Sequence, residues 1–237
     1  MNMIKKLIML MVAGVLGTLP MQAQKVDPKL SYTDENGFDK EDTSIKEAQA
    51  PLPVVFRANP TDIGEWTPSF EWHVYRTKGD AKRTEVLTRY EEETEYTFME
   101  SGSYEIELKA YVYNSNGDTL RLESNPLTVD ILDSKLEFPN AFSPNGDGTN
   151  DIYRAKPDYK SIVSFHAVIL NRWGQKLYEW DSPAGGWDGK VNGHDAKDGV
   201  YFVMVKARGA DGHEYDIRKD VNLLRGYTQN GSSTTGK

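Results

Sequence analysis

The sequence contains no cysteine. This absence excludes disulfide bonds, thiol catalysis and thiolate zinc sites, and it excludes lipid attachment at an N-terminal cysteine. A chain without disulfides must hold each domain together with a hydrophobic core. Methionine is also scarce after the N-terminus, because five of the seven methionines lie in residues 1–21.

Clusters of Lys and Arg are missing as well. The formal net charge is −8 at pH 7. Nucleic acids and anionic membrane surfaces attract proteins through grouped basic side chains. We therefore expect no nucleic-acid partner.

The sequence has one long apolar run, Leu7–Leu19. It follows the basic residues Lys5 and Lys6 and precedes the small residue Ala23. Its 13 residues fall short of the ~20 that a membrane-spanning helix needs. The pattern is typical of a secretory signal peptide, here residues 1–23. We expect a mature chain without a transmembrane segment, exported across the inner membrane to the cell surface or the extracellular space.

Residues 24–50 are polar and acidic, with few side chains to bury. This composition predicts a flexible acidic leader.

From Leu52 onwards, short apolar or alternating runs are separated by turn residues. Strict alternation over Tyr104–Val112 places Tyr104, Ile106, Leu108, Ala110 and Val112 on one face of a strand. About seven strands in this spacing predict an Ig-like β-sandwich over residues 51–133. The expected strands are Leu52–Ala58, Phe70–Arg76, Glu85–Thr88, Tyr96–Phe98, Ser103–Asn114, Thr119–Glu123 and Leu127–Leu132.

Two details of this region resemble PKD-like or other Ig-like modules. Ser101–Ile106 resembles a tyrosine corner, with Ile106 where an antibody domain carries its second cysteine, and Trp72 matches the buried tryptophan of strand C.

Residues 134–225 show no helical period and are rich in Asp–Gly turns. We predict a second antiparallel β-sandwich in tandem with the first, so that the fold class is all-β. The expected strands are Leu136–Phe142, Ile162–Asn171, Gln175–Trp180, Val200–Ala207 and His213–Leu224.

Five short blocks follow one another in this second region: Phe142–Asp151, Asn171–Gln175, Gly186–Gly189, Asp198–Phe202 and Leu223–Arg225. Together they resemble the gliding-motility-associated C-terminal domain, which is the type B sorting domain of the type IX secretion system. The resemblance covers residues 136–225 and marks as its sorting motif Asn145, Gly146, Asp147, Gly148, Asn150, Asp151, Asn171, Arg172, Trp173, Gly174, Trp187, Asp188, Gly189, Asp198, Gly199 and Tyr201.

The resemblance implies a surface or secreted protein whose C-terminal domain is read by the outer-membrane type IX translocon. It also implies a PorP/SprF-like protein as a second candidate partner, and we expect a monomer. Residues 226–237 continue past the last strand and are predicted to be a disordered tail. The alternative is an adhesin-like module that binds carbohydrate or protein without type IX secretion.

Tyr75, Tyr111 and Tyr113 share the predicted outer face of the first sandwich. Exposed aromatic rings can stack on sugars or dock a partner. Cross-strand aromatic pairing that stiffens the sheet is the second interpretation.

Asn145, Asp147, Thr149 and Asp151 alternate along one loop, as calcium ligands do. The EF-hand template fails, because its sixth position is Asn150 and its twelfth is Lys156. A turn held by side-chain-to-backbone hydrogen bonds is the other interpretation, and no other cofactor is expected.

Catalytic motifs are absent. The four histidines (His73, His166, His194 and His213) have no zinc spacing, and no nucleophile elbow or phosphate loop occurs. We predict no enzyme activity. Trp173 and Trp187 are interpreted as capping the core, and Arg172 as stacking on an aromatic ring or contacting a partner.

Overall fold

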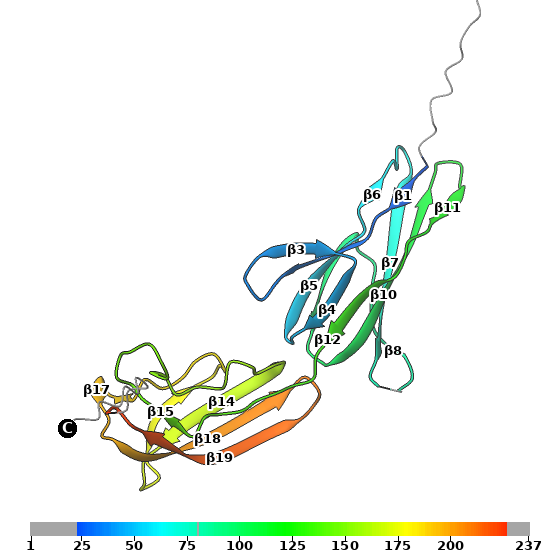
Figure 1. Cartoon of the computed structure of the whole chain (residues 1–237). Coiled ribbons are helices and arrows are strands. Elements are labelled where there is room, and N and C mark those ends of the chain that lie inside the picture. The colour runs from blue at the N-terminus through cyan, green and yellow to red at the C-terminus, as the bar shows by residue number, and fades with distance from the viewer. Residues whose placement is uncertain (1–22, 80, 227–237) are drawn as a thin grey trace, which may run out of the picture.

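The computed structural model describes residues 23–79 and 81–226, and every regular element in them is a β-strand. The all-β fold class is therefore confirmed. Two units follow one another (Figure 1): a first unit, residues 25–131, and a second unit, residues 135–225. The predicted signal peptide up to residue 22 and the tail from residue 227 lie outside the described residues. Among the described residues, no helix has the length and apolar character needed to cross a membrane.

The first unit is a sandwich of two sheets. One sheet has the order β4-β12-β10-β7-β8 with β11 beside β10, and the other has the order β3-β2-β5-β9. A two-stranded sheet joins β1 to β6. The strands are β1 (Lys25–Val26), β2 (Lys29–Thr33), β3 (Asp39–Asp42), β4 (Ser44–Ala48), β5 (Leu52–Arg57), β6 (Pro60–Thr61), β7 (Thr67–Thr77), β8 (Thr84–Arg89), β9 (Glu93–Phe98), β10 (Gly102–Tyr113), β11 (Thr119–Leu122) and β12 (Leu127–Ile131).

The predicted flexible leader over residues 24–50 is wrong. Strands β1 to β4 lie in this segment, and β2 pairs with β5 while β4 pairs with β12. Leu30 and Ile45 are buried in the core of the first unit. Few apolar side chains suffice in this segment because β3 and β4 are edge strands and the partner strands β5 and β12 supply more of the core.

The core of the first unit follows the predicted alternation. All five residues from Tyr104 to Val112 that were expected on one face are buried. The tyrosine corner is confirmed, since the Tyr104 hydroxyl donates a hydrogen bond to the Glu100 carbonyl oxygen at 2.7 Å. Trp72 is fully buried, and its ring centroid lies 5.6 Å from that of Phe56.

The second unit is built on a five-stranded sheet with the order β13-β19-β18-β14-β15. All its strand pairs are antiparallel except β13 with β19, which is parallel. The short strands β16 and β17 pair with each other. The strands are β13 (Ala141–Phe142), β14 (Ile162–Leu170), β15 (Lys176–Trp180), β16 (Lys190–Val191), β17 (His194–Asp195), β18 (Gly199–Gly209) and β19 (Glu214–Leu223).

The strand expected over Leu136–Phe142 is shorter, because only Ala141–Phe142 forms a ladder. Pro139 lacks a backbone N–H and cannot donate to a neighbouring strand. Leu136 and Phe138 are nevertheless buried. The layer that covers the inner face of the sheet is therefore mostly non-strand chain, which contributes Leu136, Phe138, Tyr153 and Trp187 to the core.

Contacts between the two units centre on Ala210, at the β18–β19 turn. The Ser101 N–H donates to the Ala210 carbonyl oxygen at 3.0 Å, and the Ala50 N–H donates to Ser161 Oγ at 3.3 Å. Ala210 packs in the core cluster of the first unit, and Lys78 Nζ donates to the Asp211 carbonyl oxygen at 2.9 Å. The connecting Ser134 is held too, because its hydroxyl donates to Asp211 Oδ1 at 2.8 Å.

Candidate functional site

Trp187 is the centre of the candidate site in the second unit. Its side chain is fully buried, and its ring centroid lies 5.3 Å from that of Phe142 and 5.0 Å from that of Tyr201. The indole Nε1–H donates to the Lys190 carbonyl oxygen at 2.7 Å. The ring thus joins three of the sequence blocks, and the interpretation of Trp187 as a core residue agrees with its burial.

The backbone at Trp187 is also fixed. The Tyr153 N–H donates to the Trp187 carbonyl oxygen at 2.9 Å, and the Trp187 N–H donates to the Tyr153 carbonyl oxygen at 3.0 Å. Gly186 makes this approach possible, because a Cβ there would lie 2.5 Å from the Tyr153 carbonyl oxygen. The glycine before the tryptophan is therefore a packing requirement.

Arg225 connects the blocks at the surface of the same region. Its Nη1 donates to the Pro144 carbonyl oxygen and its Nη2 to the Gly189 carbonyl oxygen, both at 2.7 Å. Its backbone N–H donates to Asp198 Oδ2 at 3.1 Å, and Nη2 lies 3.4 Å from Asp195 Oδ1. One residue just after the last strand thus holds the segments around Pro144, Gly189 and Asp195–Asp198, through its guanidinium and its backbone N–H together.

Close packing and backbone conformation in this region restrict three further motif residues, which are Gly189, Gly199 and Tyr201. A Cβ at Gly189, whose φ is +77°, would lie 2.8 Å from Pro144 Cγ. Gly199 has φ +151°, which a residue with a side chain rarely adopts. The Tyr201 hydroxyl donates to the Lys197 carbonyl oxygen at 2.7 Å, and Asp188 Oδ1 accepts the Lys190 N–H at 3.0 Å.

The loop over Asn145–Asp151 is organised around the Asp151 carboxylate. Oδ1 accepts the N–H groups of Gly146 at 2.7 Å and Asn145 at 2.9 Å, and Oδ2 accepts that of Gly148 at 2.8 Å. Asp147 Oδ1 accepts the Thr149 N–H at 2.8 Å. These contacts match the interpretation of a turn held by side-chain-to-backbone hydrogen bonds.

The calcium hypothesis for Asn145, Asp147, Thr149 and Asp151 stays a prediction. No group of three or more His, Cys, Asp or Glu side chains in the described ranges is placed to hold a metal ion. Both Asp151 oxygens already accept backbone N–H groups, so a cation would have to compete with these hydrogen bonds. Calorimetric titration with calcium to millimolar concentration tests the hypothesis directly.

The same loop gives a pH prediction. Hydrogen bonds from the N–H groups of Gly146, Gly148 and Asn145 lower the pKa of Asp151. A carboxylate whose folded pKa is depressed adds stability above its ordinary pKa of about 3.9, and this stability is lost as pH falls through the folded value. We expect Asp151→Asn to lower the melting temperature at pH 7 and to flatten the acid-side loss of stability.

Thermal melting of the full chain between neutral and strongly acidic pH measures this effect. Asp220→Asn, on the exposed end of β19, is the matched control. Parallel melting curves for Asp151→Asn and wild type throughout the acid range would show that the loop does not depend on the ionised carboxylate.

The hairpin tip over Asn171–Gln175 departs from its prediction. Trp173 was interpreted as capping the core, but its side chain is 75% exposed. The reason is local, since the tip closes on itself through Asn171: Oδ1 accepts the N–H groups of Trp173 and Gln175, both at 3.0 Å. Gly174 adopts φ +80° and its N–H donates to the Asn171 carbonyl oxygen at 2.9 Å.

The three tyrosines of the first unit do not form one patch. In the β7–β10 ladder, Tyr75 pairs with Glu105, whereas Tyr111 pairs with Ser69. Tyr75 and Ser69 are six positions apart on β7, which corresponds to about 20 Å. A single ligand-binding patch can therefore include Tyr111 and Tyr113 but not Tyr75. Among the described residues, no ring contact joins any two of the three tyrosines.

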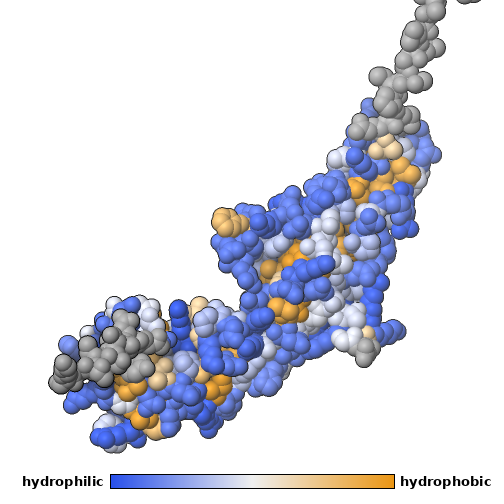
Figure 2. All heavy atoms as spheres, in the orientation of Figure 1, coloured by the Kyte–Doolittle hydropathy of each residue, from blue (hydrophilic) through white to orange (hydrophobic). Residues whose placement is uncertain are grey.

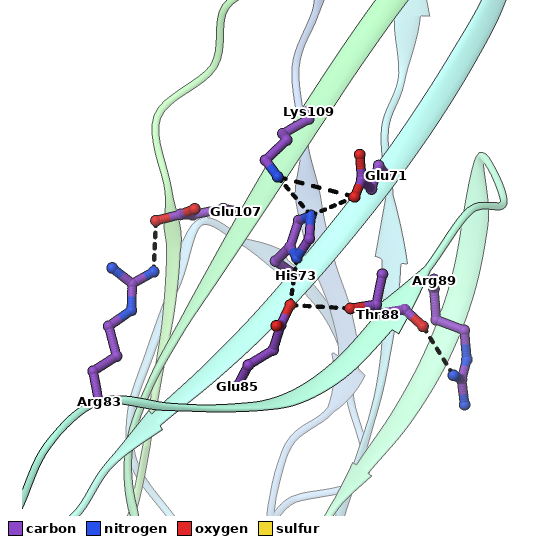
Figure 3. A network of polar contacts seen from close by, with 8 residues as sticks. All are labelled: Glu71, His73, Arg83, Glu85, Thr88, Arg89, Glu107 and Lys109. Atoms are coloured by element: carbon purple, nitrogen blue, oxygen red, sulfur yellow. Dashed lines mark hydrogen bonds and ion pairs between the residues drawn. The ribbon is translucent and has the colours of Figure 1, made fainter.

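A polar network fills the face between them (Figure 3). The His73 ring lies between Glu71 and Glu85, with its Nδ1 contacting Glu85 and its Nε2 2.8 Å from Glu71 Oε1 and 2.8 Å from Lys109 Nζ. His73 is only 8% exposed. The hydrogen bond from His73 is the largest cause that lowers the pKa of Glu85.

This network fastens β8 to β7 through the contacts of His73 with Glu85 and Glu71. Arg83, which donates to Glu107 at 2.5 Å, also covers Tyr75, with its Cζ 3.7 Å from the ring centroid. The Arg83 guanidinium thus covers one face of the Tyr75 ring, which argues against a role of this ring in ligand binding.

Sequence reasoning missed Arg225 as a functional residue, although Leu223–Arg225 was one of the blocks. The only signal was its place in the last block, because its partners Pro144, Gly189 and Asp198 come from three other segments.

Comparison with known proteins identifies part of the chain. Residues 136–219 match the CHU_C type IX secretion signal domain. This match confirms the resemblance to a sorting domain that the sequence blocks indicated. No curated protein matches the chain.

Solved structures show only distant likeness. The major pilin subunit BcpA of Bacillus cereus has a TM-score of 0.26 at 11% identity, covering 86% of this chain and 67% of that one. Dimeric latent PorU from Porphyromonas gingivalis has a TM-score of 0.26 at 9% identity, covering 86% of this chain and 20% of that one. The chicken CNTN1 FN1-FN3 domains have a TM-score of 0.25 at 9% identity, with coverage of 81% and 76%. TM-scores this low support no argument about function.

Proposed function

We propose that this chain, whose residues 136–219 match a type IX secretion signal domain, is a non-enzymatic protein that carries its Ig-like first unit to the cell surface or the medium. The secretion signal itself implies export by the type IX system. The proposal adds that the second unit alone is sufficient as the export signal. The first unit is the part of the protein that this signal carries out of the cell.

One observation carries the proposal. Four of the five family blocks gather around Trp187 and Arg225, where the Arg225 guanidinium holds the Pro144 and Gly189 carbonyl oxygens and the Arg225 backbone N–H holds Asp198. A motif dispersed over the sequence becomes one rigid surface only in the folded unit. We infer that the export machinery reads a folded domain and not an extended peptide.

The absence of enzyme activity remains part of the proposal. Two of the four histidines are used in structural contacts: His73 lies in the β7–β8 network, and His166 Nδ1 lies 2.6 Å from Asp181 Oδ1 on an exposed surface. Paired acid and base chemistry needs two groups whose environments differ strongly, facing one substrate position. These contacts supply no such pair.

One partner follows from the matched domain, and the other statements about partners are proposals. The type IX translocon follows from the matched domain. A PorP/SprF-like protein, monomeric behaviour and the choice between surface attachment and release are proposals for experiment. The adhesin alternative requires a ligand for Tyr111 and Tyr113, which a glycan array with Tyr111→Ala and Tyr113→Ala variants tests.

Fusion to a reporter tests the address. A reporter with a signal peptide followed by residues 134–237 should reach the surface or medium in a host that has the type IX machinery. In an otherwise identical host without a working translocon, it should stay in the periplasm. Periplasmic retention in both hosts would falsify the proposal that the second unit is sufficient for export.

A further inference from the structure

One face of the second unit carries an apolar stripe outside its core. In the ladders, Leu170 pairs with Phe202 and Val168 pairs with Met204. Val200 continues the stripe and is 50% exposed, while Phe202 is 38% exposed. These side chains are not members of the core cluster, which lies on the opposite face of the sheet. Figure 2 shows hydrophobic spheres on this unit in the view of Figure 1.

The stripe leads directly to the hairpin tip, because Leu170 is the last residue of β14. Trp173 stands at that tip and is the most exposed of the large hydrophobic side chains in the described ranges. Four hydrogen bonds within Asn171–Gln175, between 2.9 and 3.0 Å, hold the backbone of the tip. A rigid turn that presents an exposed indole lowers the entropy cost of docking that ring.

Arg172 gives the tip a positive charge. Its Cζ lies 4.2 Å from the Trp173 ring centroid, a cation–π geometry. No ion pair joins Arg172 to a carboxylate among the described residues. The guanidinium therefore keeps its charge available to a partner.

Most charges beside the stripe are paired with each other, whereas Asp220, opposite Phe202 in the ladder, is exposed and has no ion pair among the described residues. Lys206 pairs with Asp216 at 2.6 Å, Arg218 pairs with Asp216 at 3.0 Å, and Arg208 pairs with Glu214 at 3.7 Å. Residues 136–226 contain 12 Lys and Arg against 13 Asp and Glu, so this unit is nearly neutral although the whole chain is at −8. Within the tip Asn171–Gln175, Arg172 is the only charged side chain.

We propose that Trp173 and Arg172 are the anchor by which this protein engages its export receptor. The receptor would offer an apolar slot for the indole, with carboxylates at its mouth for the guanidinium, and its rim would cover the stripe of Leu170, Val200 and Phe202. The inference rests on the proposed function, because it assigns the surface through which the address is read. Tryptophan and arginine are the residue types that most often dominate the binding energy of interfaces.

Export of the full chain tests the anchor. We expect Trp173→Ala to lower the exported fraction about tenfold, since hot-spot truncations of this kind cost at least tenfold in affinity. Arg172→Glu should lower the exported fraction as strongly, because the new carboxylate would be repelled by the carboxylates proposed for the receptor. Arg172→Lys, which keeps the charge but loses the planar stack, should fall between Arg172→Glu and wild type.

Phe38→Ala is the matched control. Phe38 is 64% exposed and follows the turn between β2 and β3 of the first unit, where Asp34 Oδ1 accepts its N–H at 2.9 Å. It should be exported like wild type. All four variants should keep the wild-type melting temperature, because the altered side chains bury little surface.

The outcomes separate the two hypotheses. If wild type needs a working translocon but Trp173→Ala and Arg172→Glu are exported normally, the anchor is wrong and the proposed function stands. If wild type is exported equally with and without the translocon, the proposed function itself fails. If sedimentation shows a dimer that Trp173→Ala dissociates while export is unchanged, the face pairs two copies of this chain and the proposal is overturned.

Discussion

Trp187→Ala should destabilise the second unit by about 3–5 kcal/mol, which is the usual cost of truncating a buried tryptophan to alanine. The indole is fully buried between Phe142 and Tyr201, so its removal leaves a cavity between three segments. It also leaves the Lys190 carbonyl oxygen without its donor.

Hydrogen exchange of the full chain is the appropriate measurement, since a chain with two cores need not unfold in one transition. Protection should fall in β13, β18 and β19 and stay unchanged in β7 and β10 of the first unit. Trp173→Ala, which removes an exposed indole, is the control and should change protection in neither unit. Wild-type protection of β18 in Trp187→Ala would mean that the tryptophan is not the centre of this core.

Arg225→Met should lower the free energy of unfolding of the second unit by about 2–4 kcal/mol. Removing one partner of a charged hydrogen bond costs about 1.5–3 kcal/mol, and here several acceptors lose the same donor group. Pro144 and Gly189 would each keep a carbonyl oxygen without the guanidinium at 2.7 Å. Methionine preserves much of the side-chain length, so the loss reports on the polar contacts.

Arg225→Lys should recover part of the stability, because an ammonium can reach one carbonyl oxygen but not the whole set. Denaturant unfolding followed through the tryptophans of the second unit measures the series. Arg121→Met, at an exposed ion pair of the first unit, is the matched control and should cost less than about 1 kcal/mol. Equal unfolding midpoints for Arg225→Met and Arg121→Met would show that Arg225 is an ordinary surface residue.

Local patterns predicted the strands that have clear alternation. In β10, every second residue from Tyr104 to Val112 is apolar and buried, because a strand points successive side chains to opposite faces. The Asp–Gly and Asn–Gly turns were recognised for a similar reason: Gly117, Gly189 and Gly212 adopt φ between +77° and +86°, which the turn chemistry of these pairs favours.

Patterns with few apolar residues were misinterpreted. Residues 24–50 have the composition of a flexible leader because they contain few apolar side chains, yet β2 and β4 in this segment pair with strands of the first unit. β4 lies at the edge of its sheet and β2 lies between β3 and β5, and each adds one buried apolar side chain while its partner adds several. Whether this polar segment forms strands therefore depends on the apolar residues of the partner strands β5 and β12 and not on its own composition.

By itself, the sequence determined the all-β class, the alternating core faces, the turn positions and the sorting-domain blocks, since each depends on neighbours within a few residues. The tertiary structure decided that Arg225 ties Pro144, Gly189 and Asp198 together, that Trp173 points to solvent while Trp187 is buried, and that Tyr75 stands apart from Tyr111. The physical reason is that burial and long-range hydrogen bonds depend on which segments the chain brings together in space. Two tryptophans in similar glycine-flanked turns can therefore meet opposite environments.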